Sequence, residues 1–407
     1  MKILLVHNFY GSEAPSGENA VYEAERELLR AHGHHVIEFT RLSDTIRSQG
    51  AAGVIRGALA TPWNPFSARA LRDLILSERP GVLHAHNTFP LISPSIFSAA
   101  RALGVATVLS LHNYRCFCAA AIPLRAGRPC TECLDQHSVI PALRYGCYRG
   151  SRIATLPLAA MIALHRRLGT WERQVDAYIA LTEFQRDKLV AAGLPAGRVH
   201  LKPHFYPAPP SPQPWRERAA KVVYIGRLGA EKGLSFLLEA WWLWGEAAPA
   251  LELIGDGPER EALERAIAAA GLGAKVLLSG QLPFAQVQER LAQARLLVLP
   301  SVCYEGFPMA IREAYALGVP VAGSRLGSIP CIVEDGRTGV LFAPGDAADL
   351  QRTVSRIWSD AAGLETMGAA ARAEFEQNYT AERNYATLME IYAAAMKNRA
   401  GQREAAS

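Results

Sequence analysis

Long apolar runs are missing from this sequence. No run reaches the roughly 20 residues that an α-helix needs to span a bilayer. The first residues, MKILLVHNFYG, have an apolar core that is too short for a secretory signal peptide, and the flanks are wrong for one. We therefore expect a cytoplasmic protein, with any membrane contact made at the inner face of the membrane.

A strong imbalance of charge is missing as well. The formal net charge is only +5, and no block rich in lysine and arginine is interleaved with aromatic residues. Proteins that bind nucleic acid usually carry such a basic patch or stripe. Nucleic acid is therefore not an expected partner.

The length and the order of patterns predict two domains. A chain of 407 residues exceeds the usual size of a single core. Six prolines in residues 203–218 exclude a regular element and mark a boundary. We predict an α/β protein with two Rossmann-like doubly wound domains facing a cleft, residues 1–208 and 209–380. The first domain would carry a cysteine-bearing insertion at 112–150, and a C-terminal helix at about 381–399 would pack back on it.

The strands are predicted from short apolar runs that alternate with helical patterns, as in parallel sheets buried on both faces. In the first half these runs are KILLVHNF, HHVIEFT, GVLHAHN, VATVLSLH, VDAYIAL and RVHLKP. In the second half they are KVVYIGRL, ALELIGDG, KVLLSG, RLLVLPS, PVAG and GVLFAP.

The stretch SVCYEGFPMAIREAYALGVPVAG, residues 301–323, follows one of these strands. Pro308 suits the first position of a helix, which places Glu305 in the preceding loop and Glu313 inside the helix. Gly306 would allow a ligand to approach the backbone, and a helix start favours an anion. Two carboxylates fit an anion that carries hydroxyl-rich groups at both ends. The alternative is one carboxylate that stabilises the helix dipole and another that is solvated.

Three further turns lie between a strand and a helix in the second half. GRLGAEKG, residues 226–233, offers Arg227 and Lys232 beside glycines, which suits a diphosphate, although such cations are often only solvated. IGDGPER, residues 254–260, offers Asp256 as a ligand or as a helix cap, and GQLPF opens another turn. Turns at the carboxyl ends of neighbouring strands predict a site for a nucleotide diphosphate.

In their order and spacing, GRLGAEKG, IGDGP, GQLP and PSVCYEGFPMAIREAYALGVPV resemble the donor domain of glycosyltransferase family 4, retaining enzymes of the GT-B fold. The last segment matches the E-x7-E motif of that family at Glu305 and Glu313. The resemblance implies a hexosyltransferase that moves a sugar from a nucleotide-diphosphate-sugar to a saccharide or lipid-linked acceptor. Polysaccharide biosynthesis is the expected setting.

The resemblance also implies roles for single residues. Arg227 and Lys232 would hold the donor diphosphate and stabilise it as the leaving group, while Glu305 would contact the sugar hydroxyls and Glu313 the ribose. The sequence contains no Asp-x-Asp pair, so we expect catalysis without a metal cofactor. Other residues expected to contact the donor are Gly226, Asp256, Gly257, Leu282, Gly306, Phe307 and Pro308.

The first half contributes fewer candidates. The family usually has a Gly-Gly pair in its first loop, and Gly17 is the better match here, so that loop is either a phosphate contact or a plain connection. His112 ends a buried strand, where a structural role is common, but the family has a histidine there that faces the sugar. His84 and His86 end another strand and face the same expected cleft.

Residues 151–171 combine an apolar stretch with Arg152, Arg166 and Arg167 at its ends. This pattern fits an interfacial helix on an anionic membrane, and it equally fits a core helix with basic ends. Peripheral membrane contact is therefore one of two interpretations of this segment.

The sequence has seven cysteines, five of them between residues 116 and 147. An odd number in a cytosolic chain favours metal before disulfides. Cys130 and Cys133 have the C-x2-C spacing of structural zinc sites, and Cys118 and Cys147 would complete the set, with Cys116 as alternate. The insertion has no evident core of its own, so zinc would give it order. The alternative is a set of reduced, partly buried thiols.

Two other functions fit the sequence less well. A GT-B epimerase or phosphorylase would need further acid and base groups or a much longer chain. A non-catalytic module that only binds nucleotide-sugars would have no reason to keep Arg227, Lys232, Glu305 and Glu313 together.

Overall fold

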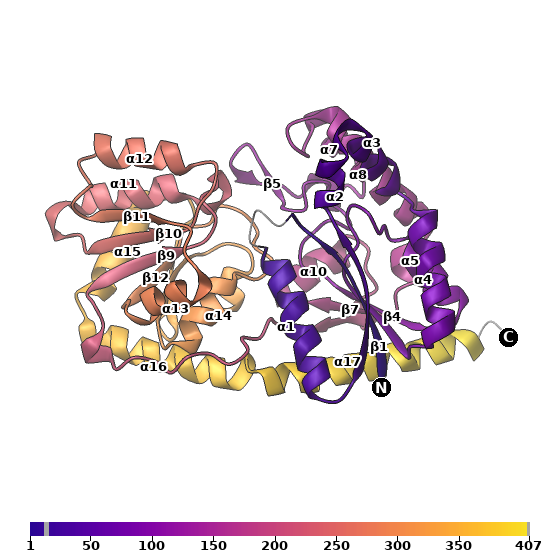
Figure 1. The fold of residues 1–407 in the computed structure, drawn as a ribbon. Helices are drawn as coiled ribbons and strands as arrows, with labels where there is room; N and C mark the ends of the chain where they lie inside the picture. The colour runs from indigo at the N-terminus through magenta and orange to yellow at the C-terminus, as the bar shows by residue number, and fades with distance from the viewer. Residues whose placement is uncertain (12–15, 405–407) are drawn as a thin grey trace. The chain divides into compact units, whose positions relative to one another are not determined.

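The computed structural model describes residues 1–11 and 16–404 and divides into two compact units (Figure 1). Unit 1 comprises Met1–Pro123, Cys130–Pro203 and the chain from Asn384 on. Unit 2 comprises Leu124–Pro129 and His204–Arg383. Each unit contains a six-stranded sheet whose paired strands are all parallel.

The sheet of unit 1 has the strand order β2-β1-β3-β4-β7-β8. The strands are β1 (Lys2–Phe9), β2 (His35–Leu42), β3 (Val82–Asn87), β4 (Ala106–Ser110), β7 (Ala177–Ala180) and β8 (Val199–Leu201). The helices are α1 (Gly17–Ala31), α2 (Asp44–Ser48), α3 (Gly50–Ala60), α4 (Pro65–Glu78), α5 (Ser95–Ala102), α6 (Glu132–Asp135), α7 (Ile140–Tyr145), α8 (Arg152–Arg167), α9 (Thr170–Arg173), α10 (Glu183–Ala191) and α17 (Ala381–Glu404). The segment Leu124–Pro129, which belongs to unit 2, forms a short antiparallel hairpin of β5 (Leu124–Arg125) and β6 (Arg128–Pro129).

The sheet of unit 2 has the order β11-β10-β9-β12-β13-β14. Its strands are β9 (Lys221–Ile225), β10 (Ala250–Ile254), β11 (Val276–Gly280), β12 (Leu296–Leu299), β13 (Val321–Ser324) and β14 (Gly339–Phe342). Its helices are α11 (Leu234–Trp244), α12 (Arg260–Ala269), α13 (Phe284–Ala292), α14 (Met309–Ala316), α15 (Ala347–Trp358) and α16 (Ala361–Asn378). The strand order reverses between β9 and β12, and ligands of open α/β sheets bind at the carboxyl ends of the strands at such a point.

The strands form where the apolar runs predict them. β3, β4 and β12 are buried along their whole length, which explains why they read as continuous apolar runs and not as alternating ones. The helix predicted to begin at Pro308 begins one residue later, with Pro308 as its N-cap. Glu305 lies in the loop and Glu313 in α14, which confirms those two placements.

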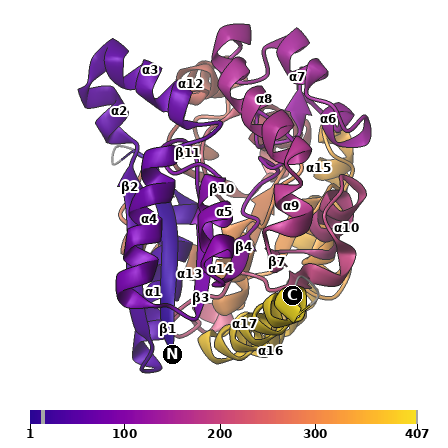
Figure 2. The ribbon, with the colours of Figure 1, turned by 90° about the vertical axis from the view of Figure 1, so that its right-hand side faces the viewer.

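The C-terminal helix contributes to the core of unit 1. α17 continues to Glu404, five residues beyond the predicted end. Its residues Leu388, Ile391, Tyr392 and Ala395 pack in one buried cluster with residues of α1, β1, β3, β4 and β7 (Figures 1 and 2).

The insertion does not rely on a core of its own. Ala119, Cys133 and Ala142 pack with Leu158, Met161 and Ile162 of α8 in a second buried cluster. Figure 2 shows α6, α7 and α8 gathered together in unit 1. The insertion thus has no separate core, as its composition predicts, and α8 supplies apolar surface for it.

Candidate functional site

The loops after β9, β10 and β11 are joined at the carboxyl edge of the unit 2 sheet. The Gly226 N–H donates to the carbonyl of Ile254 at 3.0 Å, and the Gly255 N–H donates to the carbonyl of Gly280 at 2.9 Å. A β-carbon on Gly255, whose φ is +143°, would lie 1.9 Å from the Gly226 carbonyl oxygen, so only glycine fits there. This contact brings together the loops that carry Gly226, Asp256, Gly257 and Leu282.

Asp256 stabilises its own loop. Its Oδ1 accepts from the Gly257 N–H at 2.7 Å, and its Oδ2 lies 3.3 Å from Arg260 Nη1. Asp256 is not the predicted helix cap, because α12 begins at Arg260 with Glu259 as its N-cap, and Asp256 bonds to the loop before the helix. Leu282 is half-buried in the next loop.

Lys232 and Glu305 form a short ion pair at this edge. Lys232 Nζ lies 2.6 Å from Glu305 Oε1, which also accepts from Ser301 Oγ at 2.7 Å. Burial acts to raise the pKa of the Glu305 carboxyl, but Lys232 outweighs it and holds that pKa below its ordinary value. Burial likewise acts to lower the pKa of Lys232, and Glu305 raises it above its ordinary value. Both groups are therefore charged at neutral pH.

The backbone holds this pair in place. A β-carbon on Gly233 would lie 2.1 Å from the carbonyl oxygen of Pro300, so the turn that carries Lys232 packs directly on the end of β12. The Val302 N–H donates to the Glu231 carbonyl at 3.0 Å, and Ser328 Oγ donates to the Glu305 carbonyl at 2.7 Å. The cation and the carboxylate are thus positioned before any ligand arrives.

Arg227 differs from Lys232 in its exposure. Its side chain is 64% exposed, and its guanidinium lies 3.8 Å from the Glu231 carboxylate. Tyr224 Oη donates to the Arg227 carbonyl at 2.8 Å, which fixes the backbone and leaves the side chain extended. An exposed guanidinium beside a fixed ammonium provides donors for two phosphate groups.

Glu313 and the residues after Glu305 are less accessible. Glu313 is only 6% exposed; its Oε2 lies 3.4 Å from Gln288 Nε2 and its Oε1 lies 3.8 Å from Arg312 Nη2. Burial raises the pKa of this carboxyl. The Phe307 ring is buried between the rings of His204 and Tyr379, whereas Gly306 and Pro308 are partly exposed.

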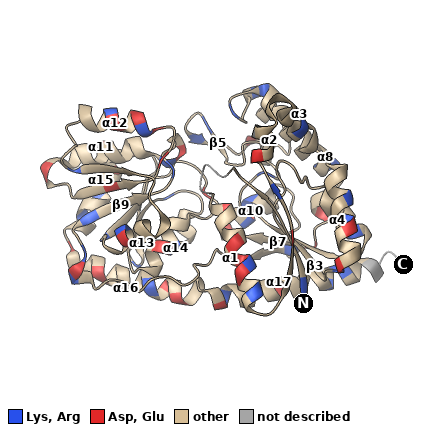
Figure 3. Cartoon of the chain, in the orientation of Figure 1, with Lys and Arg blue, Asp and Glu red and all other residues tan. Residues whose placement is uncertain are grey.

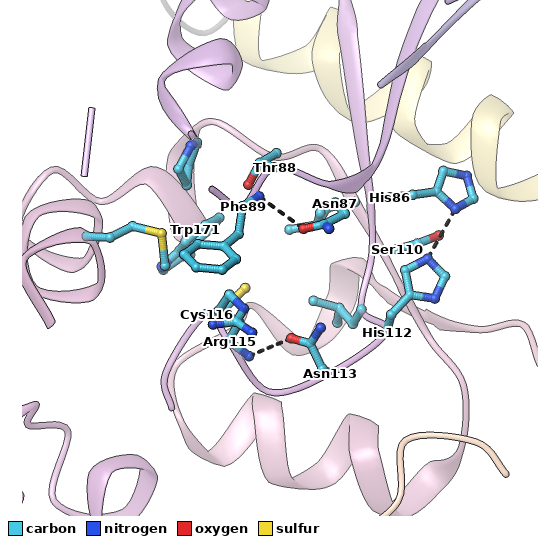
Figure 4. Close-up of a pocket in the computed structure, with 14 residues that line it drawn as sticks. His86, Asn87, Thr88, Phe89, Ser110, His112, Asn113, Arg115, Cys116 and Trp171 are labelled. Atoms are coloured by element: carbon cyan, nitrogen blue, oxygen red, sulfur yellow. Dashed lines mark hydrogen bonds between the residues drawn. The ribbon is translucent and has the colours of Figure 1, made fainter. Parts of the chain in front are cut away.

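In unit 1, His112 follows β4 and borders a small cavity of about 50 Å³. Figure 4 shows this cavity, whose lining includes His86, Asn87, Phe89, Arg115 and Trp171. His86 Nδ1 and His112 Nε2 are 3.1 Å apart, and the two rings are stacked with their centroids 5.2 Å apart. The guanidinium of Arg115 lies 4.2 Å from the centroid of the Phe89 ring.

The start of α1 reaches the same region. Gly17 is the exposed first residue of α1, and residues 12–15 of the predicted phosphate loop lie outside the described residues. Asn113 Nδ2 donates to Glu18 Oε1 at 2.7 Å, which ties the start of α1 to the residue after His112. Burial raises the pKa of Glu18 even though Asn113 and Arg115 oppose the shift.

A buried charged cluster lies behind His86. Within residues 1–11 and 16–404, Glu25, His84 and His86 are the one group of three or more potential metal ligands whose atoms lie within 4.8 Å of one another. Lys202 Nζ lies 2.7 Å from Glu25 Oε2 and so already supplies a positive charge to this carboxylate. This cluster is therefore better described as an ion pair with two histidines than as a metal site.

The predicted zinc ligands are reduced cysteines in the described part of the chain. Burial raises the pKa of Cys118 to about 12 and that of Cys133 to about 11, which fits neutral thiols. Cys118, Cys130, Cys133 and Cys147 do not form a close ligand group among the described residues. The zinc site stays a prediction, and no step of the chemistry below depends on it.

The segment 151–171 has a buried face and exposed apolar residues, and its contact with a membrane stays a prediction. Thr155, Leu158, Met161 and Ile162 of α8 are buried in the core, whereas Ile153 is 82% exposed. Arg166, at the basic end of the segment, is partly buried with its guanidinium 5.5 Å from the centroid of the Phe117 ring.

Sequence reasoning missed Glu25, Lys202, Glu18 and Asn113. Glu25 does leave a signal, because it lies on the apolar stripe of α1 with Val21, Tyr22, Leu28 and Leu29, all of them buried. A charged residue on such a stripe requires a buried partner. Its partner Lys202 lies 177 residues away in the sequence, so no local pattern identifies it.

Two family models match most of the chain. The Glycosyl transferase 4-like domain matches residues 17–204, and Glycosyl transferases group 1 matches residues 219–360.

Two curated proteins with similar sequences are sugar transferases. The sulfoquinovosyl transferase of Arabidopsis thaliana is 26% identical over 325 residues, which cover 76% of this chain and 56% of that protein. The 2-deoxystreptamine glucosyltransferase of Streptomyces kanamyceticus is 30% identical over 269 residues, which cover 65% of this chain and 64% of that protein. The match spans less than two thirds of the length of each of these relatives.

Solved structures share the fold over nearly the whole chain. HepE of Anabaena in complex with UDP has a TM-score of 0.64 at 18% identity, covering 97% of this chain and 100% of that one. Sucrose-phosphate synthase from Thermosynechococcus elongatus has a TM-score of 0.65 at 20% identity, covering 100% of both chains. The predicted fold class, two doubly wound domains of the GT-B type, is confirmed.

Proposed function

Because this chain belongs to the glycosyltransferase 4-like family of GT-B enzymes, we propose that it transfers a sugar from a nucleotide-diphosphate-sugar to a saccharide or lipid-linked acceptor. One observation carries the proposal. Arg227 and the Lys232–Glu305 pair lie in the loops that follow β9 and β12, where the strand order of unit 2 reverses. That position places two cations and one carboxylate where open α/β sheets bind their ligands.

We assign the donor diphosphate to Arg227 and Lys232. A lysine ammonium has three donors, and Glu305 engages one of them, so two remain for phosphate oxygens. Oε1 of Glu305 accepts from Lys232 and Ser301, and we assign its second oxygen to a hydroxyl of the transferred sugar. Glu313 is assigned to the ribose on the strength of the E-x7-E motif, and because it is buried it would have to gain access when the donor binds.

The proposed reaction retains the configuration of the donor sugar. An acceptor hydroxyl forms a bond to the anomeric carbon on the face from which the nucleoside diphosphate departs, and the bond between that carbon and the phosphate oxygen breaks. The acceptor proton passes to the departing phosphate oxygen. Arg227, Lys232 and backbone amides stabilise the charge that grows on the leaving group, which is why we propose that no metal cofactor is needed.

Binding of nucleotide-sugars tests this function directly. A ligand present at about 100 times its dissociation constant stabilises a protein by about 2.7 kcal/mol. In a thermal-shift screen, we expect at least one nucleotide-diphosphate-sugar to raise Tm, while the free sugar and inorganic phosphate at equal concentration do not. If no nucleotide-sugar raises Tm at millimolar concentration, the proposed function is wrong.

We also propose that unit 1 contacts an anionic membrane, which would give access to a lipid-linked acceptor. α7 and α3 both contact α8 (Figures 1 and 2). The charged residues of these three helices are all arginines (Figure 3). We propose that their exposed apolar side chains and their arginines make up an apolar-basic surface, a combination that favours anionic lipid. None of the described helices is long and apolar enough to cross a bilayer. The apolar residues of this surface, exposed by 57 to 82%, are Val54, Ile55, Leu59, Ile140, Ile153 and Leu156.

Vesicle binding tests the apolar-basic surface. Ile153→Asp combined with Leu156→Asp should abolish co-sedimentation with vesicles of anionic phospholipid, because both side chains are exposed and would place charges at the interface. The matched control is Leu243→Asp with Leu277→Asp, which changes two exposed leucines of unit 2 and should leave binding intact. An unmutated protein that stays in the supernatant would contradict the membrane proposal.

A further inference from the structure

Five residues of unit 1 form a continuous chain of polar contacts that ends at His112. Lys202 Nζ lies 2.7 Å from Glu25 Oε2, and Glu25 Oε1 lies 3.2 Å from His86 Nε2. His86 Nδ1 lies 3.1 Å from His112 Nε2 (Figure 4). Asn384 Oδ1 also accepts from Lys202 at 3.2 Å. Lys202, Glu25 and His86 are nearly inaccessible to solvent, whereas His112 is partly exposed.

We propose that Glu25 is a positioning residue for His112, and that it acts through His86 to fix which ring nitrogen of His112 carries the proton. The protonation pattern of His112 follows from the contacts alone. The expected effect of Glu25 on catalysis rests on the proposed function. Neither the family comparisons nor the sequence motifs assign a role to Glu25.

The protonation pattern follows from the charge at each end of the chain of contacts. Burial acts to raise the pKa of Glu25, but Lys202 and the two histidines outweigh it, and the carboxyl is held well below its ordinary pKa. Burial lowers the pKa of His86 to about 4, so this ring is neutral at pH 7 and carries one proton. Beside an ionised carboxylate, that proton resides on Nε2, which leaves Nδ1 of His86 as an acceptor.

His112 must then donate. The group 3.1 Å from the acceptor Nδ1 of His86 is His112 Nε2, which is therefore protonated. Nδ1 of a neutral His112 keeps its lone pair and would serve as an acceptor for a hydroxyl group. This nitrogen is buried in the structure, so it would have to gain access to a sugar hydroxyl when the donor binds.

The neighbouring residues support this path over others. His84 Nδ1 is also 3.1 Å from Glu25 Oε1, but Tyr392 Oη lies 2.8 Å from that nitrogen, and Ser110 Oγ lies 2.9 Å from Nε2 of the same ring. His84 thus has its own partners, and His86 is the histidine that links Glu25 to His112. The titratable groups around His86 are His7, Tyr22, Glu25, His84, His112, Lys202 and Tyr392.

The first test reads the His112 tautomer in the unmutated protein. In protein labelled with ¹⁵N-histidine, the two ring nitrogens of a neutral histidine give separate signals, and His112→Gln identifies the signals of His112. We expect a protonated Nε2 and an unprotonated Nδ1 for His112 at pH 7.5. A protonated Nδ1 with an unprotonated Nε2 in the unmutated protein would overturn the inference.

The second test removes the charges without leaving one unpaired. In Glu25→Leu with Lys202→Met, the pair is replaced by apolar side chains of similar size, a change that is often neutral for stability. We expect the His112 proton to distribute over both ring nitrogens. We also expect kcat to fall by about 10- to 100-fold, which is the range found when outer partners that orient a functional histidine are lost. The donor KM should change little.

A matched control separates positioning from general disturbance. Glu252→Leu with Lys221→Met removes a comparable pair of unit 2, whose charged atoms lie 2.8 Å apart. This control should keep both kcat and the His112 tautomer. If the double variant at Glu25 and Lys202 keeps a single His112 tautomer, or if both double variants lose kcat equally, Glu25 does not position His112. Lack of turnover in the unmutated protein would count against the proposed function and would leave the tautomer measurement valid.

Discussion

Arg227→Ala is expected to lower kcat by about 10² to 10³, the usual cost of losing one donor that stabilises developing charge, while Tm stays within the error of the unmutated protein. The charge on the departing phosphate grows toward the transition state, so the loss should appear in kcat more than in donor affinity. Folding should be unaffected because the side chain is 64% exposed and its ion pair with Glu231 is long, at 3.8 Å.

Arg265→Ala provides a matched control for this change. Arg265 is 73% exposed and also lies 3.8 Å from a glutamate one helical turn away, Glu261. Initial rates with the nucleotide-sugar identified by thermal shift would be measured for both variants. Full activity in Arg227→Ala, or an equal loss in Arg265→Ala, would contradict the role assigned to Arg227.

The effect of Lys232→Ala on activity is harder to interpret than the sequence suggests, because the change also affects stability. The motif alone predicts that either cation could be removed with little effect on folding. In the structure, Lys232 and Glu305 are largely buried and 2.6 Å apart. Removing one partner of such a pair leaves a buried charge without compensation. For this reason Arg227 is the better residue for testing catalysis.

Lys202→Ala is expected to destabilise unit 1 by about 3–5 kcal/mol, the usual cost of breaking a buried ion pair by removing one partner. The change leaves the Glu25 carboxylate fully buried without its ammonium group. Urea unfolding of Lys202→Ala and of the unmutated protein measures the difference in the free energy of unfolding. Glu25→Leu with Lys202→Met should restore most of the lost stability, because no charge is left unpaired. A single variant as stable as the unmutated protein would show that the pair contributes little.

The contribution of Glu25 and Lys202 to stability is also expected to depend on pH. The pKa of Glu25 is lower in the folded chain than its ordinary value of 4.5, so its contribution is complete above that value and is lost as the pH falls through the folded pKa. The pKa of His86 is about 4 in the folded chain against an ordinary value of 6.5. As the pH is lowered, His86 is therefore protonated in the unfolded chain first, and the stability of the fold decreases from about pH 6.5 to about pH 4. The double variant at Glu25 and Lys202 should lose the Glu25 part of this dependence.

The sequence predicts the parts of the site that local patterns determine. Apolar runs bounded by Gly and Pro locate the strands, and the spacing from Glu305 to Glu313 places one carboxylate in a loop and the other in a helix. Because the carboxyl ends of parallel strands lie at one edge of a sheet, the sequence predicts that the loops of Gly226, Asp256 and Glu305 lie close together.

Other parts depend on contacts that no local pattern contains. Lys202 meets Glu25 through the pairing of β8 with β7 and the packing of α1, and Asn113 meets Glu18 across 95 residues. The insertion gains its core from α8, so its own composition could not show how it is stabilised. Glu313 is predicted as a ligand contact from spacing alone, and only the structure shows how deeply it is buried.

Release of nucleoside diphosphate from a nucleotide-sugar tests the central claim most directly. The protein would be incubated with the donor that stabilises it most, with and without candidate saccharide and lipid-linked acceptors, and the diphosphate product would be quantified. The account predicts release that an acceptor accelerates and that Arg227→Ala reduces by about 10² to 10³. A donor that binds tightly, yet yields no diphosphate with any acceptor or yields it equally in Arg227→Ala, would contradict glycosyl transfer at this site.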